Sequence, residues 1–145
     1  MRSFDDSLPM NLLRAREAVM KQFIPTLQEH GLSPQQWRTI RVLQQESGLE
    51  ISEVAKRTHL LLPSLSRIIQ NLESRDLIER RSVENDQRRK ALFLTESGKR
   101  IFKQIRPKSA QRYKRIAELF GQEKLDQLDE LLHQLVISID QPSDD

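Results

Sequence analysis

Apolar side chains recur with a helical period through most of the chain. From Leu8 to Glu29 they return every three or four residues, which predicts a long helix with one covered face. A second helix is expected to begin after Ser33, because Ser33 caps it, Pro34 suits its first turn and Gln36 completes a capping box. The chain therefore opens with two helices that are joined near Gly31.

The middle of the chain predicts a short helix followed by a strongly amphipathic one. Residues 51–60 form the short helix, and the next helix runs over Pro63–Arg75 after a break at HLLLP. One side of this second helix is polar and includes an arginine, so the helix can pack on one side and contact base edges with the other. Its inward stripe consists of Leu65, Ile68, Ile69 and Leu72.

After this helix the apolar period changes to two. Residues 77–83 and 90–95 alternate and are rich in branched side chains, and the polar run 84–89 lies between them. Two such segments joined by a charged turn predict a β-hairpin.

A helical period returns in the last third of the chain. Thr95 is expected to cap a long helix that reaches about Phe120, with Pro107 inside it. A last helix follows Gly121, and its apolar residues step by three and four from Leu125. These two helices and the first helix form a lobe separate from the central elements.

The order of elements predicts a mostly α (α+β) fold built around a winged helix-turn-helix. Residues 33–96 are expected to form the winged helix-turn-helix. Residues 1–32 and 97–140 supply the outer helices, and residues 141–145 form an acidic tail.

Composition excludes several classes of function. The 24 Lys and Arg residues exceed the 21 Asp and Glu residues by only three, so their placement matters more than their excess. Cysteine is absent, and the chain has neither a signal-peptide pattern nor an apolar run of about 20 residues. These features predict a cytoplasmic protein without membrane contact. The histidines lack metal-ligand spacing and no catalytic motif occurs, so neither a metal, a cofactor nor an enzymatic activity is predicted.

The amphipathic helix and the hairpin after it together favour binding to double-stranded DNA. In a helix-turn-helix the second helix lies in the major groove with its N-terminal residues at the base edges. Read alone, however, the polar face of this helix favours a solvated surface. Arginine pairs with guanine and glutamine with adenine. The predicted contacts from this helix are Pro63, Ser64, Ser66, Arg67 and Gln70.

The hairpin has a dense group of cations at its turn. These cations suit the phosphate backbone or the narrow minor groove, while Asp86 can accept backbone N–H groups in the turn or orient a guanidinium. The alternative is a charged turn that only protects a sheet edge. The predicted wing residues are Arg80, Asp86, Arg88, Arg89 and Lys90, with Arg81 beside them.

The run NDQRRKALFLTESGK resembles the wing signature of the MarR family, in which Asp-x-Arg is followed by a strand and Leu-Thr-x-x-Gly. The preceding run ISEVAKRTHLLLPSLSRIIQNLESRDLIER is similar to the two central helices of that family. The segments LLRAREAVM and LSPQQWRTIRVLQ resemble the branch that regulates homoprotocatechuate (aromatic acid) degradation operons. The chain departs from that branch at His59 and Leu60–Leu62. In the branch pattern, a basic residue stands just before the proline.

The resemblance implies a homodimer in which the outer helices, residues 1–32 and 97–140, interleave across a twofold axis. An apolar stripe along the last helix agrees with this, although intramolecular packing is the alternative. A dimer places two reading helices about 34 Å apart, so the operator is expected to be a pseudo-palindrome. The stripe consists of Leu128, Leu132, Leu135, Val136 and Ile139.

The resemblance also implies a small aromatic acid as effector, bound in a crevice between the two lobes. An arginine can hold its carboxylate in a planar, bidentate pair. Arg16 is preferred over Arg14, and both can instead form salt bridges or lie on a solvated face; Trp37 can instead be a core residue. The candidate ligand residues are Arg16, Arg14, Trp37, Arg38, Arg41 and His59.

These features predict a repressor of an aromatic-acid catabolic operon that the effector releases from DNA. Two other functions remain open. One is an effector-independent activator or architectural DNA-binding protein, and the other is a protein-interaction module that kept the fold without DNA binding.

Overall fold

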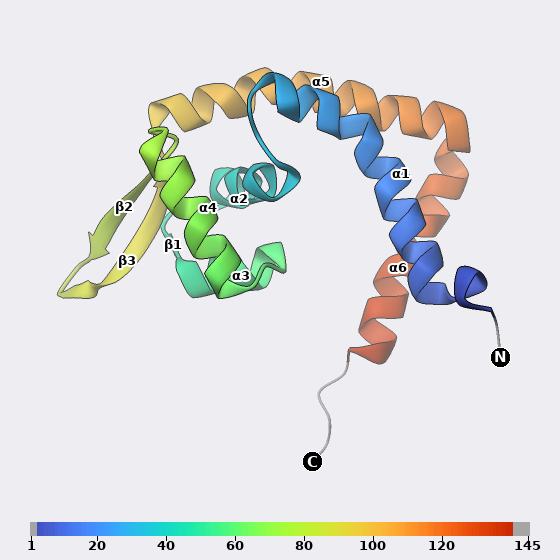
Figure 1. Ribbon diagram of the computed structural model, residues 1–145, viewed down its shortest axis with the longest axis horizontal. Helices are drawn as coiled ribbons and strands as arrows, with labels where there is room; N and C mark the ends of the chain where they lie inside the picture. Colours follow the sequence, from blue (N-terminus) through green and yellow to red (C-terminus); the bar gives the residue numbers. More distant parts are fainter. Residues whose placement is uncertain (1–2, 141–145) are drawn as a thin grey trace, which may run out of the picture. The chain divides into compact units, whose positions relative to one another are not determined.

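The structure is a computed structural model that describes residues 3–140 (Figure 1). The acidic tail predicted for residues 141–145 lies outside the described residues. The chain divides into two compact units, residues 1–109 and residues 110–145, so the long helix α5 belongs to both. The elements in chain order are η1 (Phe4–Asp6), α1 (Leu8–Glu29), α2 (Pro34–Gln45), β1 (Leu49–Glu50), α3 (Ile51–Thr58), α4 (Leu62–Ser74), β2 (Ile78–Val83), β3 (Asp86–Leu94), α5 (Glu96–Phe120) and α6 (Gln122–Ile139).

The core of the first unit lies among α2, α3, α4 and the sheet. Helix α2 begins with the predicted capping box, in which the Gln36 N–H donates to Ser33 Oγ and the Ser33 N–H donates to Gln36 Oε1. The inward stripe of α4 is confirmed, because Leu65, Ile69 and Leu72 are fully buried and Ile68 is partly buried against the core. Burial of such side chains stabilises the unit by about 1.5–3 kcal/mol each.

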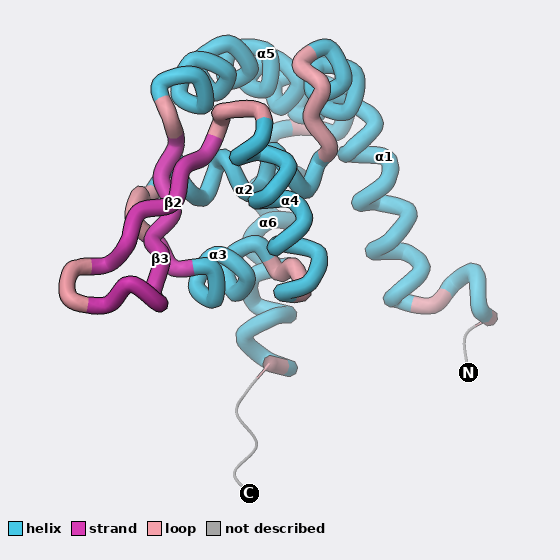
Figure 2. Tube along the Cα trace, turned by 60° about the vertical axis from the view of Figure 1, so that its left-hand side comes forward, coloured by secondary structure: helices cyan, strands magenta, loops and turns pink. Residues whose placement is uncertain are grey.

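The sheet has three antiparallel strands in the order β1-β3-β2, and its hairpin extends away from the helices α3 and α4 (Figures 1 and 2). Strand β1 was not predicted, because two residues carry no local periodicity and exist as a strand only through pairing, Leu49 with Leu92 and Glu50 with Ala91. Strand β3 also begins earlier than predicted, at Asp86, so only the two residues 84–85 form the turn.

The connection between β3 and α5 depends on close packing. Thr95 caps the helix as predicted, since the Gly98 N–H donates to Thr95 Oγ1 at 3.1 Å. A Cβ at Gly98 would lie 2.2 Å from the carbonyl oxygen of Leu77, so only glycine fits at this position. The wing is thereby fixed against the first turn of α5.

Helix α1 forms as predicted, but its apolar face is not covered within the chain. Leu8, Leu12 and Val19 are exposed, and only Thr26 and Leu27 are buried in this helix. The periodicity of the helix indicates that a face needs cover, but not which surface supplies it.

The second unit has no buried residue among residues 110–140. In α6 the side chains of Leu125, Leu132 and Leu135 are partly buried, whereas Leu131, Val136 and Ile139 are exposed. A unit without a buried core does not account for its own stability. None of the helices in residues 3–140 is both long enough and apolar enough to cross a bilayer.

Candidate nucleic-acid interface and effector pocket

Helix α4 presents a polar face opposite its buried stripe. Ser64, Arg67 and Gln70 are exposed, and within residues 3–140 no hydrogen bond or ion pair is found for their side chains. Pro63 is exposed in the first turn and Ser66 is partly buried. The helix therefore places one guanidinium, one amide and one hydroxyl at the surface with their donors unused.

The tip of the wing is a tight turn held by a carboxylate. Asn85 has a φ of 67°, and the Arg88 N–H donates to Asp86 Oδ1 at 2.9 Å. Asp86 thus accepts a backbone N–H group, one of the two roles expected from the sequence. The Arg88 side chain is exposed and forms no ion pair with any acid in the described part of the chain.

The other cations of the wing already have partners. Arg80 Nε donates to Glu73 Oε1 at 2.7 Å, and Lys90 Nζ donates to Ser82 Oγ at 2.8 Å. Arg89 Nε donates to Glu50 Oε1 at 2.9 Å, and its Nη2 bonds the same oxygen. This hydrogen bond and the charge of Glu50 raise the pKa of Arg89. Arg81 pairs with Glu79. Arg88 thus differs from the four other cations of the wing, because its side chain has no partner among the described residues.

A cavity of about 510 Å³ lies on the surface shared by α2 and the first part of α5. Its size is in the usual range for a small-molecule site. The predicted residues Arg38 and Arg41 line it, together with Phe102 and Arg106 of α5, which sequence reasoning missed. Arginines and an aromatic ring around one cavity suit an aromatic carboxylate. The other lining residues are Val42, Gln44 and Gln45.

Arg38 is the best-fixed cation of this cavity. Its Nη1 donates to the carbonyl oxygen of Thr58 at 2.7 Å. Partial burial, and then the charge of Arg16, lower the pKa of Arg38. The positive charge of Arg16 on α1 therefore disfavours the charged form of Arg38 on α2, although Arg16 does not line the cavity.

The remaining predicted ligand residues lie in other settings. Trp37 is buried in the core and stacks on Phe102 with ring centroids 5.6 Å apart, so it supports the cavity wall. Arg14 Nη2 donates to the Asp5 carbonyl at 2.7 Å and to Asn11 Oδ1 at 2.6 Å. His59 is exposed at the end of α3, with a φ of 56°. Like Arg16, neither Arg14 nor His59 lines the 510 Å³ cavity.

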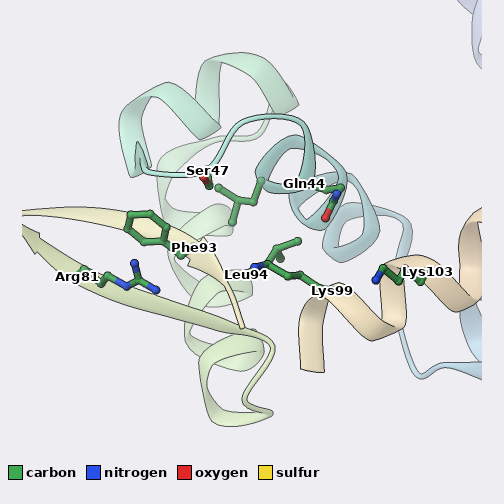
Figure 3. A pocket seen from close by; sticks show the side chains of 8 residues that line it. Gln44, Ser47, Arg81, Phe93, Leu94, Lys99 and Lys103 are labelled. Carbon is green, nitrogen blue, oxygen red and sulfur yellow. The ribbon is translucent and has the colours of Figure 1, made fainter. Parts of the chain in front are cut away.

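A second cleft of about 390 Å³ lies among the end of α2, the strands β2 and β3 and the start of α5 (Figure 3). Arg81 of β2 lies over the ring of Phe93, 4.1 Å from its centroid. Lys99 and Lys103 of α5 line the same cleft, and Lys99 Nζ pairs with Glu96 Oε1 at 3.4 Å. The cation–π contact and the ion pair occupy much of its charge, so the α2–α5 cavity is the better effector candidate. No group of metal ligands is found within residues 3–140.

The arrangement of α3, α4 and the hairpin defines the class of protein. Two short helices joined by a tight turn, followed directly by a β-hairpin with cations at its tip, form a winged helix-turn-helix. The fold class predicted from the sequence is confirmed.

The chain belongs to the MarR family. The sequence profile of that family matches residues 30–89. The chain is 39% identical over 129 residues to the HTH-type transcriptional regulator FarR of Neisseria gonorrhoeae, covering 89% of this chain and 88% of that one. It is 35% identical over 131 residues to the homoprotocatechuate degradative operon repressor of Escherichia coli, covering 90% and 88%. These proteins are transcriptional regulators and not enzymes, and the chain is of the same kind.

A solved structure supports the same assignment. The crystal structure of NadR in complex with 4-hydroxyphenylacetate has a TM-score of 0.77 to this chain at 38% identity. The match covers 93% of this chain and 96% of NadR. The family resemblance read from the sequence is thereby confirmed.

Proposed function

We propose that this protein is a homodimeric, ligand-responsive repressor that binds a pseudo-palindromic operator and leaves it when a small aromatic acid binds. The observation that carries the proposal is the set of exposed donors without partners on α4 and at the wing tip. Ser64, Arg67, Gln70 and Arg88 are poised to bind groups outside the chain.

In this proposal α4 enters the major groove and the wing follows the phosphate backbone. Arg67 suits the N7 and O6 acceptors of guanine, and Gln70 suits the adenine edge. Arg88 supplies the phosphate contact that requires no internal rearrangement. Pro63, Ser64 and Ser66 position the helix, while Arg80, Arg89 and Lys90 contribute after leaving their present partners, and Asp86 holds the turn.

The dimer is inferred from apolar surface that the chain leaves open. Leu128, Leu131, Val136 and Ile139 in α6 are exposed, and the second unit buries nothing among residues 110–140. Removal of such a surface from water favours association. The apolar face of α1 adds to the area available for a partner copy.

The effector is inferred from the cavity and from the relatives. Arg38 and Arg41 supply cations beside the ring of Phe102, and the charge of Arg16 lowers the pKa of Arg38. The solved NadR complex contains 4-hydroxyphenylacetate, and the related E. coli protein is a repressor of a homoprotocatechuate operon. A phenolic or aryl carboxylate is therefore the proposed class of ligand. We assign its carboxylate to Arg16, Arg38 and Arg41, with Trp37 supporting the cavity wall; Arg14 and His59 do not line the cavity and are left out of this assignment.

Repression and release are linked by differential affinity. If the DNA-bound arrangement and the effector-bound arrangement are different states, each ligand weakens the other by the same factor. Coupling of about 1–3 kcal/mol gives roughly 5–150-fold release.

The test combines an operator and an effector. A duplex selected by the protein from a randomised pool is titrated with protein, with and without 4-hydroxyphenylacetate. Wild type is expected to bind the duplex and to be released by the acid. The variants Arg16→Ala and Arg41→Ala are expected to bind equally and to resist release.

Arg14→Ala serves as the matched control for these variants. Its guanidinium already binds the Asp5 carbonyl, so it is expected to respond like wild type. Release that is unchanged in both test variants would move the ligand site elsewhere. Binding that no aromatic acid affects would favour an effector-independent DNA-binding protein instead.

A further inference from the structure

Two exposed leucines lie at the N-terminal end of α4. Leu61 is 77% exposed and Leu62 is 50% exposed, although the preceding Leu60 packs against the core. Leu61 occupies the N-cap position of α4, where no side chain caps the helix. Ser, Thr, Asp and Asn are preferred at this position, because their side chains accept a hydrogen bond from the first turn of the helix.

The core does not explain these side chains. The buried stripe of α4 begins one turn later at Leu65, and the fully buried part of the core is complete without Leu61 and Leu62. Neither the helix start nor internal packing therefore requires leucine at position 61. The two leucines are adjacent in sequence and exposed at the N-terminal end of the helix that carries Ser64 and Arg67.

The residues near these two leucines on α4 are polar or basic. Ser64 and Arg67 lie within two turns of them, and both are exposed. An apolar protein partner is a poor fit to such a margin, because a charged guanidinium would lose water there without gaining a partner. The major groove of DNA fits it, since it offers anionic phosphates, polar base edges and the C5-methyl group of thymine.

We propose that Leu61 and Leu62 read thymine, by packing against thymine C5-methyl groups in the major groove at the N-terminal end of α4. This inference rests on the proposed DNA-binding function and adds the base that this end of the helix selects. The leucines supply selectivity for A·T pairs at positions adjacent to those contacted by Ser64 and Arg67. The C5-methyl group is the feature that distinguishes thymine from uracil at this edge.

The experiment removes the methyl group from the DNA and the side chain from the protein. A duplex selected by the wild-type protein from a randomised pool is resynthesised with uracil in place of each thymine in turn. At one or two positions per half-site, wild type is expected to lose about fourfold in affinity per methyl group, since burial of a methyl-sized group contributes ~0.8 kcal/mol and 1.4 kcal/mol is a factor of ten.

The variants Leu61→Ala and Leu62→Ala complete a double-mutant cycle. Each is expected to bind the thymine duplex less tightly and to show no further loss with uracil at its own position. Leu61→Met, which keeps an apolar side chain of similar reach, is the matched control and is expected to keep the thymine dependence. Thermal unfolding of all variants is expected to match wild type, because both leucines lie largely outside the core.

The outcomes separate this inference from the proposed function. Tight DNA binding without any effect of uracil, or an equal uracil effect in the alanine variants, overturns the inference and leaves the proposed function intact. A change in oligomeric state in the alanine variants without a change in thymine dependence would assign the leucines to a protein contact and also overturns it. Failure of the wild-type protein to bind any duplex removes the proposed function itself.

Discussion

The two units of the chain differ in how they are stabilised. The first unit buries a contiguous apolar cluster that extends from Leu27 to Ile105 and joins α2, α3, α4 and the sheet. The second unit, described over residues 110–140, buries no residue, yet its helix α6 is rich in leucine and isoleucine. The first unit buries most of its apolar surface, although the apolar face of α1 is exposed, whereas the second unit leaves its apolar side chains exposed or only partly buried.

This difference separates two kinds of apolar pattern that look alike in a sequence. In α4 the stripe of Leu65, Ile69 and Leu72 meets a core supplied by the same chain. In α6 a stripe of the same period has no such core within its unit, which is why a second copy of the chain is proposed to cover it. The DNA contact is assigned to the first unit, and assembly to the second unit together with α1.

The largest expected effect comes from breaking the first unit. Ile69→Ala removes a fully buried side chain and is expected to lower the free energy of unfolding by about 2–5 kcal/mol. Denaturant unfolding measures it. The neighbouring exposed change Gln70→Ala is the control and is expected to stay within about 0.5 kcal/mol. Equal losses at both positions would contradict the assignment of inner and outer faces in α4.

The next effect comes from α6. Val136 is 57% exposed in the single chain, and the proposed dimer covers it. Val136→Lys is therefore expected to give a monomer by sedimentation and about a hundredfold loss of operator affinity, because two linked half-site contacts become one. A residue that faced solvent in the assembled protein would tolerate this change with little effect on either measurement. Ser138→Lys adds the same charge at a polar exposed position and is expected to leave the dimer intact. A dimer in both variants would remove α6 from the interface.

A smaller effect distinguishes the cations of the wing. Arg88→Ala is expected to lower DNA affinity about tenfold, since a hydrogen bond to a charged group is worth about 1.5–3 kcal/mol, and to reduce the salt slope by about one. Arg89→Ala is expected to cost about threefold, because Arg89 must first leave Glu50. Fluorescence anisotropy over a range of salt concentrations measures both losses. A larger loss for Arg89 would reverse the roles assigned to the two residues.

The smallest effect is a gain. Glu50→Gln frees Arg89 and removes a negative charge from the wing, so affinity for the operator is expected to rise about threefold. Glu53→Gln makes the same change in net charge on α3 and forms no ion pair within residues 3–140, so its gain should be smaller. Equal gains would mean that only total charge matters and that the pair with Glu50 does not restrain Arg89.

The helices and the hairpin could be predicted because their signals are local. Capping residues such as Ser33 and Thr95, and the stripe of α4, lie within one or two turns of each other. Strand β1 could not be predicted, because Leu49 and Glu50 become a strand only by pairing with residues some forty positions later. The early start of β3 was missed for the same reason, since Ser82 pairs with Lys90 and Val83 with Asp86 across an irregular register.

The candidate sites were predictable in part. The chemistry of α4 and the wing was visible in the residue types, but which cations are free was not, because the pairs of Arg80 with Glu73 and Arg89 with Glu50 join separate elements. In the α2–α5 cavity, Arg38 and Arg41 were named from the sequence, whereas Phe102 and Arg106 lie some sixty residues further along the chain. They come together only where α5 contacts α2, at the stacked rings of Trp37 and Phe102.

The most direct test of this account is the stoichiometry and salt dependence of binding to a selected duplex. Sedimentation of the full chain with that duplex is expected to show two protomers per duplex. Affinity is expected to fall steeply and log-linearly with salt, as counterions leave the phosphates. Sedimentation of protein and duplex as separate species at low salt would contradict the central claim that α4 and the wing form a DNA-binding surface in a dimer.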